Sequence, residues 1–209
     1  SISMGTAGVG LANITAVVNA TTKSWIGAGV IVTAFANAAA ASIYSGLSDR
    51  SNKPLMDTTF KGVAVTATSR EDVTGVSVAG AGGSTGGGAG SASATQYDRT
   101  TSAIIYKNAQ INTLTTLPAG AVAINPVIGA LQSVRVLASS LSNLTLGAGS
   151  LAIGGTGGIG VGINAGVINK TTLAQIENGT SSSDRAVVNA ARDISVEAIS
   201  KQEFVVIAV

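Results

Sequence analysis

Apolar and polar residues alternate in short runs along this chain, most clearly after residue 158. Residues 159–163 alternate Ile or Val with glycine, and residues 194–198 alternate Ile, Val and Ala with Ser and Glu. A period of two residues indicates a β-strand with one buried face. Polar turns separate the runs at 169–170, 178–179 and 181–184. The pattern predicts an all-β chain of successive strands that each bury an apolar row.

One segment departs from the alternation. Residues 33–47 are rich in alanine, which has the highest helix propensity of the amino acids. The segment therefore predicts a short helix, the only one in the chain. Residues 29–33, with the sequence GVIVT, lead directly into it and favour a strand, so both interpretations stay open.

Three sequence features recur in a constant order along the chain. A pair of threonines stands at 21–22, 100–101 and 171–172, so that successive pairs are 79 and 71 residues apart. A strand of the form apolar-x-Val-x-Ala follows each pair, and another apolar residue comes ten positions after that strand begins. These strands begin at Val63, Val134 and Ile194. The shared phase indicates internal copies of one structural unit.

The repeat predicts a single β-solenoid segment of a longer chain over residues 1–209. Its copies cover roughly 8–80, 88–155 and 158–209. Surplus length falls at one point of the repeat, which predicts loop-rich excursions at 27–62 and 107–130. A unit of 60–79 residues exceeds the roughly 20–25 residues of a short solenoid coil, so we expect three coils per unit. That gives about 8–10 rungs in all, a rod on the order of 40–48 Å long.

The composition agrees with a narrow interior and limits the possible chemistry. Gly accounts for 27 residues, aromatic residues for 3% and charged residues for 11%, so small and β-branched side chains must fill the core. The net charge of +2 comes without a basic cluster and does not indicate nucleic-acid binding. The absence of cysteine and histidine excludes disulfides, thiol nucleophiles and histidine-based catalytic or metal sites.

The ten carboxylates are the remaining candidates for chemistry. They are Asp49, Asp57, Glu71, Asp72, Asp98, Glu177, Asp184, Asp193, Glu197 and Glu203. A pair of them could hydrolyse a polysaccharide, which is the alternative function, and substitution of Asp98 or Asp184 would test it. No inward-facing cluster is expected, since neighbours such as Glu71 and Asp72 point to opposite faces of a strand. We therefore expect solvated charges, with no catalytic residue, no metal site and no cofactor.

Two further patterns have structural explanations. Residues 155–160 match GxGxxG, but no helix and no suitably placed acidic residue follows, so the glycines indicate tight turns. The threonine pairs could form an ice- or surface-binding ladder, but a spacing of about 70 residues predicts that they lie several rungs apart. The uncharged stretches 24–48 and 136–169 predict solenoid strands rather than membrane spans.

The chain closes on the apolar strand 204–209, which has no polar cap. A solenoid needs a covered end, so we expect Phe204, Val206 and Ala208 to stack against further copies or further coils of the same chain. A contact of this head-to-tail kind produces filaments.

Two phrases resemble the passenger repeats of very large bacterial exoproteins. They are GVGINAGVINKTTLAQIENG at 160–179 and VVNAARDISVEA at 187–198. The similar proteins are leukotoxin-like and filamentous-haemagglutinin-type adhesins, secreted by autotransporter or two-partner routes. The resemblance implies a right-handed parallel β-helix, located outside the bacterium or on its surface, with a structural or adhesive role toward a host cell or biofilm. It transfers no catalytic residue.

Overall fold

The computed structural model describes residues 2–49, 53–113 and 128–209. These residues are all-β: 77% of them lie in strands and none in a helix. The strands are β1 (Ile2–Ile26), β2 (Ile31–Val32), β3 (Ala41–Ser48), β4 (Pro54–Ile105), β5 (Gln110–Ile111), β6 (Gln132–Gly154), β7 (Gly158–Ile176), β8 (Val187–Val188) and β9 (Ile194–Ala208). No described segment forms a helix that could span a membrane.

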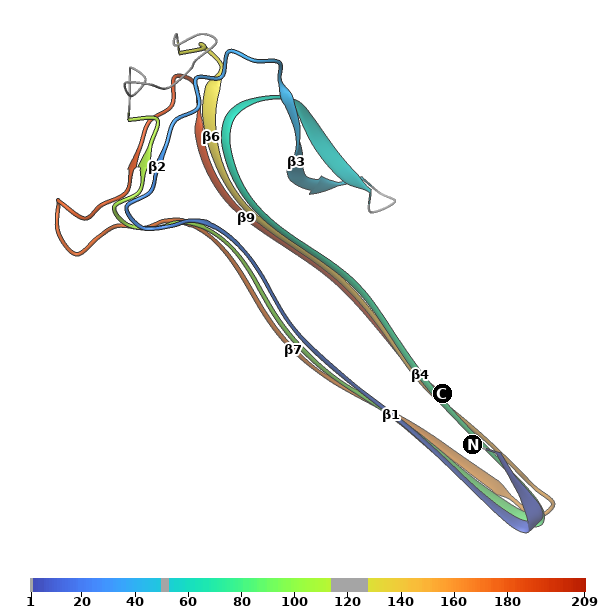
Figure 1. Cartoon of the computed structure of the whole chain (residues 1–209). Helices are drawn as coiled ribbons and strands as arrows, with labels where there is room; N and C mark the ends of the chain where they lie inside the picture. The colour runs from blue at the N-terminus through green and yellow to red at the C-terminus, as the bar shows by residue number, and fades with distance from the viewer. Residues whose placement is uncertain (1, 50–52, 114–127) are drawn as a thin grey trace.

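The long strands form two parallel stacks because β4 folds back on itself near residues 83–86 (Figure 1). Stack 1 consists of residues 61–83 of β4, followed by β6 and β9. Stack 2 consists of residues 7–26 of β1, residues 87–105 of β4, and β7. Residues 2–5 of β1 pair instead with residues 80–83 of β4 at the end of stack 1. The short strands β2, β5 and β8 form stack 3, which is also parallel. Each passage of the chain thus contributes one strand to each stack.

The pairing register matches the alignment of the sequence repeats. Val63 lies opposite Val134, and Val134 lies opposite Ile194. The threonine pairs at 21–22, 100–101 and 171–172 also lie opposite one another. One repeat is therefore one layer, and each stack holds three layers in the described residues. The prediction of about 8–10 rungs is wrong, because each layer contains two strands of about twenty residues instead of several short ones.

The wide end of the molecule, which we call the base, has an ordinary apolar core. Here stack 3 holds the ends of stacks 1 and 2 apart (Figure 1), and large side chains fill the space between the three stacks. Its fully buried members include Ile105, Ile111, Val134 and Val136. Ile194 and Val196 lie opposite Val134 and Val136 and so occupy the inward row that the alternation predicted, but in this outermost layer they are 49% and 44% exposed.

The opposite end, which we call the arm, comprises residues 2–13, 76–92 and 147–163 and ends at a thin tip (Figure 1). Its inward rows contain only Gly, Ala and Ser. The stacks approach so closely that a Cβ on Gly10 would lie 2.0 Å from the carbonyl oxygen of Gly80, and one on Gly158 would lie 2.4 Å from that of Ala152. No larger side chain fits between them.

The apolar residues of the arm consequently point outward. Ile159 is 73% exposed and Ile163 is 59% exposed. The prediction that the row Ile159, Val161 and Ile163 is buried is wrong, because the glycines between them occupy the narrow interior instead.

An antiparallel hairpin covers stack 1 on the side away from stack 2. Strand β3 pairs with the first residues of β4. Leu137, which points out of stack 1 toward this hairpin, is fully buried, and a Cβ on Gly46 would meet the side chain of Ile199 at 2.6 Å. The helix predicted within 33–47 is wrong: tertiary packing outweighs alanine propensity there, and residues 41–48 form a strand.

The described parts of the two predicted excursions lie beside the base. Residues 27–62 hold β2, β3 and the start of β4, so this excursion is largely ordered as strands. Residues 107–130 contain β5, and most of the remainder lies outside the described residues.

Candidate functional site

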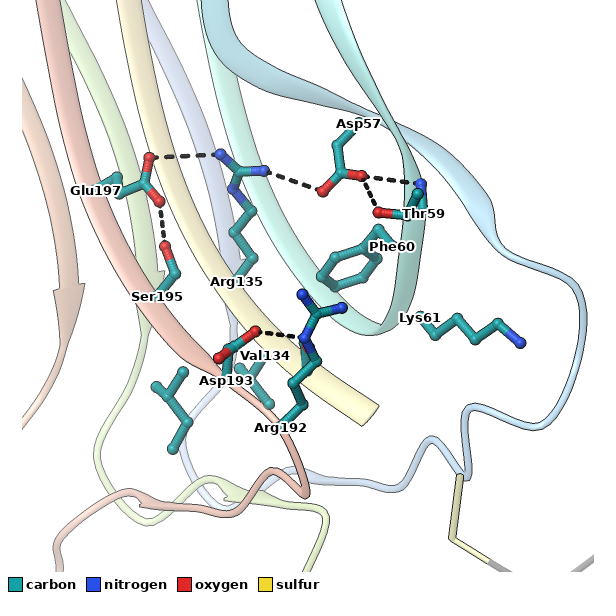
Figure 2. Close-up of a pocket in the computed structure, with 12 residues that line it drawn as sticks. Asp57, Thr59, Phe60, Lys61, Val134, Arg135, Arg192, Asp193, Ser195 and Glu197 are labelled. Carbon is teal, nitrogen blue, oxygen red and sulfur yellow. Dashed lines mark hydrogen bonds and ion pairs between the residues drawn. The ribbon is translucent and has the colours of Figure 1, made fainter. Parts of the chain in front are cut away.

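A polar cleft of about 400 Å³ lies between the β3–β4 hairpin and the beginning of stack 1 (Figure 2). Three carboxylates and three cationic side chains line it. They are Asp57, Asp193, Glu197, Lys61, Arg135 and Arg192. The sequence predicted these acids only as solvated charges. Their convergence depends on the hairpin folding back over the stack, which no local pattern indicates.

Arg135 is the central side chain of the cleft. Its guanidinium donates a hydrogen bond of 2.6 Å to the backbone oxygen of Ser45 and lies 3.4 Å from Glu197 and 3.9 Å from Asp57. Figure 2 shows Arg135 between these two carboxylates, with Arg192 beside Asp193. Ser45 and Asp57 belong to the hairpin, so their contacts with Arg135 attach the hairpin to stack 1. The Arg135 side chain is only 14% exposed, so water weakens these charged contacts little.

The carboxylates of the cleft do not resemble a hydrolytic pair. The backbone N–H and the hydroxyl of Thr59 donate to Asp57, and these bonds, followed by the charges of Arg135 and Arg192, hold the pKa of Asp57 below its usual value. Asp193 pairs with Arg192 at 2.9 Å. A glycoside hydrolase needs one carboxylic acid that stays protonated, which requires a raised pKa. All three acids of the cleft are therefore held in hydrogen bonds or ion pairs within the protein.

A second polar group lies between the two stacks, where the arm meets the base. Glu71 points inward and accepts from Arg99 at 2.6 Å and from the hydroxyl of Tyr97 at 2.6 Å. Burial, followed by the hydrogen bond to Glu71, raises the pKa of Tyr97 to about 12. We expected no inward carboxylate cluster. The structure confirms that Glu71 and Asp72 face opposite ways, but it places Glu71 among cations inside the protein.

Lys170 completes this interior group from the third layer. Its ammonium donates to the backbone oxygens of Ser140 at 2.8 Å and Lys201 at 2.7 Å, and burial lowers its pKa. Arg99 donates to Thr22 of the first layer. The group therefore joins all three layers of stack 2 to stack 1, which is a structural role.

On the outside of stack 2, equivalent residues of the three layers form polar ladders. Asn19, Asp98 and Asn169 lie side by side, and Asn169 donates to Asp98 at 2.6 Å. This bond, followed by one from Gln96, lowers the pKa of Asp98. Asp98 is thus a ladder residue.

The adjacent ladder consists of Thr21, Thr100 and Thr171. The prediction that the threonine pairs lie several rungs apart is wrong, because one repeat is one layer. The second threonine of each pair points inward, and Thr101 is fully buried. Thr21, Thr100 and Thr171 therefore form only one outward row, which is narrower than the flat surface of several threonine rows that an ice- or surface-binding protein needs.

The remaining candidates occupy turns. The carboxylate of Asp184 accepts from the backbone and hydroxyl groups of Ser181 and Thr180, which hold its pKa far below the usual value and close the loop after β7. The glycines at 155–160 surround the tip between β6 and β7, where a Cβ on Gly155 would lie 2.1 Å from a backbone oxygen, as the structural interpretation expected. The described residues contain no group of three or more acidic side chains arranged to hold a metal ion.

The residues predicted to stack lie in the inward row of β9. Phe204, Val206 and Ala208 are opposite Leu144, Leu146 and Ala148 of β6. Phe204 is still 44% exposed and Val206 48% exposed. Among the described strands, β9 pairs with β6 alone.

Comparison of this chain with protein-family models, with curated protein sequences and with solved structures gave no match. Any function must therefore be inferred from the geometry of the protein itself.

Proposed function

We propose that the chain is a segment of a right-handed parallel β-helix that serves as a structural or adhesive element of a secreted or surface-exposed bacterial filament. The observation that supports this function is the register, in which equivalent residues of successive layers lie directly opposite one another in all three stacks. A repeated layer of this kind can be extended without limit, because each new layer presents the same backbone pattern as the last.

The outermost strands supply the surfaces for extension. In the described structure, β1 pairs only with β4 on one side, while β7 and β9 form the other side. A long parallel edge presents a row of backbone donors and acceptors that readily bind another strand. We propose that further coils or copies of the same chain stack there, with Phe204, Val206 and Ala208 continuing their inward row into the next layer.

The proposed location is the bacterial cell surface or the extracellular space. It rests on the resemblance of residues 160–179 and 187–198 to exoprotein repeats. A host cell or a biofilm surface is the proposed target. The ion-paired state of the acids around Arg135 favours this mechanical role over polysaccharide cleavage.

Electron microscopy of the native material tests the proposal, together with fibre diffraction. We expect rods with a repeat of about 4.8 Å along their axis, the spacing of paired strands. Val206→Lys places a charge in the inward row of β9 and should abolish lengthwise stacking. Val205→Lys is the matched control, because Val205 is equally exposed, at 49%, but points outward. Compact single particles, or rods that are unchanged by Val206→Lys, would contradict the proposal.

A further inference from the structure

The outward face of stack 2 in the arm is apolar over most of its surface. Five side chains that are at least half exposed define two ridges, one on β1 and one on β7. They are Val9, Leu11, Ile159, Val161 and Ile163. Val17 and Val167 lie farther toward the base on the same outward rows, beyond Asn13 and Thr15 on β1 and Ala165 on β7. We call these seven residues and the strand between the ridges the arm face.

The strand between the ridges has almost no side chains. Gly88 and Gly90 of β4 lie opposite ridge residues on both sides, and Ala92 lies between Ile163 and the polar Asn13. A Cβ on Gly88 would meet no atom within 4 Å. The result is a groove of about 410 Å³ in which Leu11 lies on one side and Val161 and Ile163 on the other. Since neighbouring strands are about 4.8 Å apart, the two ridges are roughly 10 Å apart, which is wide enough to admit one row of side chains.

The arm carries no charge that could keep this face in water. Residues 2–13, 76–92 and 147–163 contain no Asp, Glu, Lys or Arg, although the chain has 22 such residues in all. The seven ridge residues expose roughly 700 Å², close to the 800 Å² that each partner contributes to a typical stable interface, and more than most monomers leave exposed in one patch.

We propose that the arm face is a lateral docking surface for the arm face of a second copy of this chain. The two faces meet across a two-fold axis as a pair of β-sheets about 10 Å apart, and an apolar ridge of each copy enters the groove of the other. The contact is perpendicular to the stacking direction, so it goes beyond the proposed function: layers stack lengthwise through strand edges, and finished rods pair sideways through arm faces.

A second copy fits this face better than a lipid bilayer does. Polar residues Ser84, Thr85 and Thr156 occupy the tip, and the outermost strands of the arm have long edges. Hydrocarbon solvates neither backbone edges nor polar turns. A facing sheet with the same layer spacing lets one ridge of each copy fill the groove of the other, and it leaves the edges available for further layers.

A pair of charge substitutions tests the proposal in the full chain. Val161→Lys with Ile163→Lys places two charges on one ridge and should weaken lateral association at least about 100-fold, because each charge would be buried without a partner. Val76→Lys with Val78→Lys is the matched control. These two residues point outward from stack 1 with the same spacing and are 57% and 61% exposed, against 50% and 59% for Val161 and Ile163. They lie on the opposite face of the arm, where Leu151 and Ile153 are also exposed, so pairing that survives this control identifies the stack 2 face as the contact.

Sedimentation and electron microscopy separate lateral pairing from lengthwise stacking. We expect paired rods for the unmodified chain and the control, and single-width rods of unchanged length for the Val161/Ile163 variant. If the chain pairs laterally but does not stack lengthwise, the unmodified chain should form discrete dimers, and the Val161/Ile163 variant should be monomeric. Single-width rods for the unmodified chain would overturn the lateral proposal. So would paired rods for the Val161/Ile163 variant, or flotation of the unmodified chain with phosphatidylcholine vesicles in place of pairing.

Discussion

The base and the arm consist of the same long strands, but their large apolar side chains point inward in the base and outward in the arm. In the base, Val and Ile, together with Ala, point inward and meet between three stacks. In the arm, two stacks meet almost backbone to backbone, with only Gly, Ala and Ser between them and the apolar residues outside. The distance between the stacks determines which face of an alternating strand can be buried. Where the third stack is absent, that distance falls below the width of a large side chain.

The largest effect should come from enlarging the interior of the arm. Gly10→Val would place a Cβ about 2.0 Å from the carbonyl oxygen of Gly80, which neither backbone can avoid. We expect the free energy of unfolding to fall by more than about 3 kcal/mol. Urea denaturation followed by circular dichroism measures the change.

Gly88→Val is the control for this substitution. Gly88 is on the neighbouring strand but points outward into open space. We expect a change within about 0.5 kcal/mol in dilute solution. Equal losses for the two variants would show that the stacks of the arm are not in close contact.

The next largest difference should come from shortening an isoleucine to alanine in the base and in the arm. Ile105 is fully buried in the base, so Ile105→Ala should lower the free energy of unfolding by about 3 kcal/mol. Ile159 is 73% exposed on the arm, so Ile159→Ala should change it by less than about 0.5 kcal/mol. The same denaturation measurement compares them, and a large loss for Ile159→Ala in the monomer would contradict the inverted arrangement of the arm.

The interior ion pair at the junction of the two regions should give a similar or slightly smaller effect. Arg99→Met leaves Glu71 without its cation inside the protein, at an expected cost of about 3 kcal/mol. The exposed Arg70→Met should cost less than about 0.5 kcal/mol. If the double variant Glu71→Met, Arg99→Met recovers none of the loss, then the unpaired charge is not its cause.

The smallest effect concerns pH. The pKa of Tyr97 is raised to about 12 in the folded protein, against about 10 when unfolded, so the unfolded chain releases its proton first. The contribution of Tyr97 is complete below pH 10, and the free energy of unfolding should fall by up to about 2 kcal/mol between pH 10 and 12.

Tyr97→Phe provides the comparison for the pH profile. Its unfolding free energy should decline less steeply over the same interval, although it loses the hydrogen bond to Glu71. Burial lowers the pKa of Lys170, so this residue makes the free energy of unfolding rise as the pH approaches 10.4. The rise is the same in the unmodified protein and in Tyr97→Phe, so it does not affect the comparison. Identical slopes above pH 10.4 would rule out the raised pKa of Tyr97.

The candidate site was much less predictable than the repeat. Asp57 is far in the chain from Asp193 and Glu197, and it joins them only because the β3–β4 hairpin folds over stack 1. The two-residue alternation of their strands places both Glu71 and Arg99 on the inward side. Their ion pair could therefore have been predicted once each repeat was known to form one layer. Before that, nothing indicated that they face each other.

The amino-acid sequence by itself determined the strand class and the register between layers, because like residues such as Val63 and Val134, or Thr100 and Thr171, pair across adjacent strands. Only the tertiary structure decided which face of each strand is buried. A period of two residues divides a strand into two faces but does not say which one points inward. That choice depends on how closely the opposite stack approaches, and in the arm this distance leaves room for glycine and alanine and excludes isoleucine and valine.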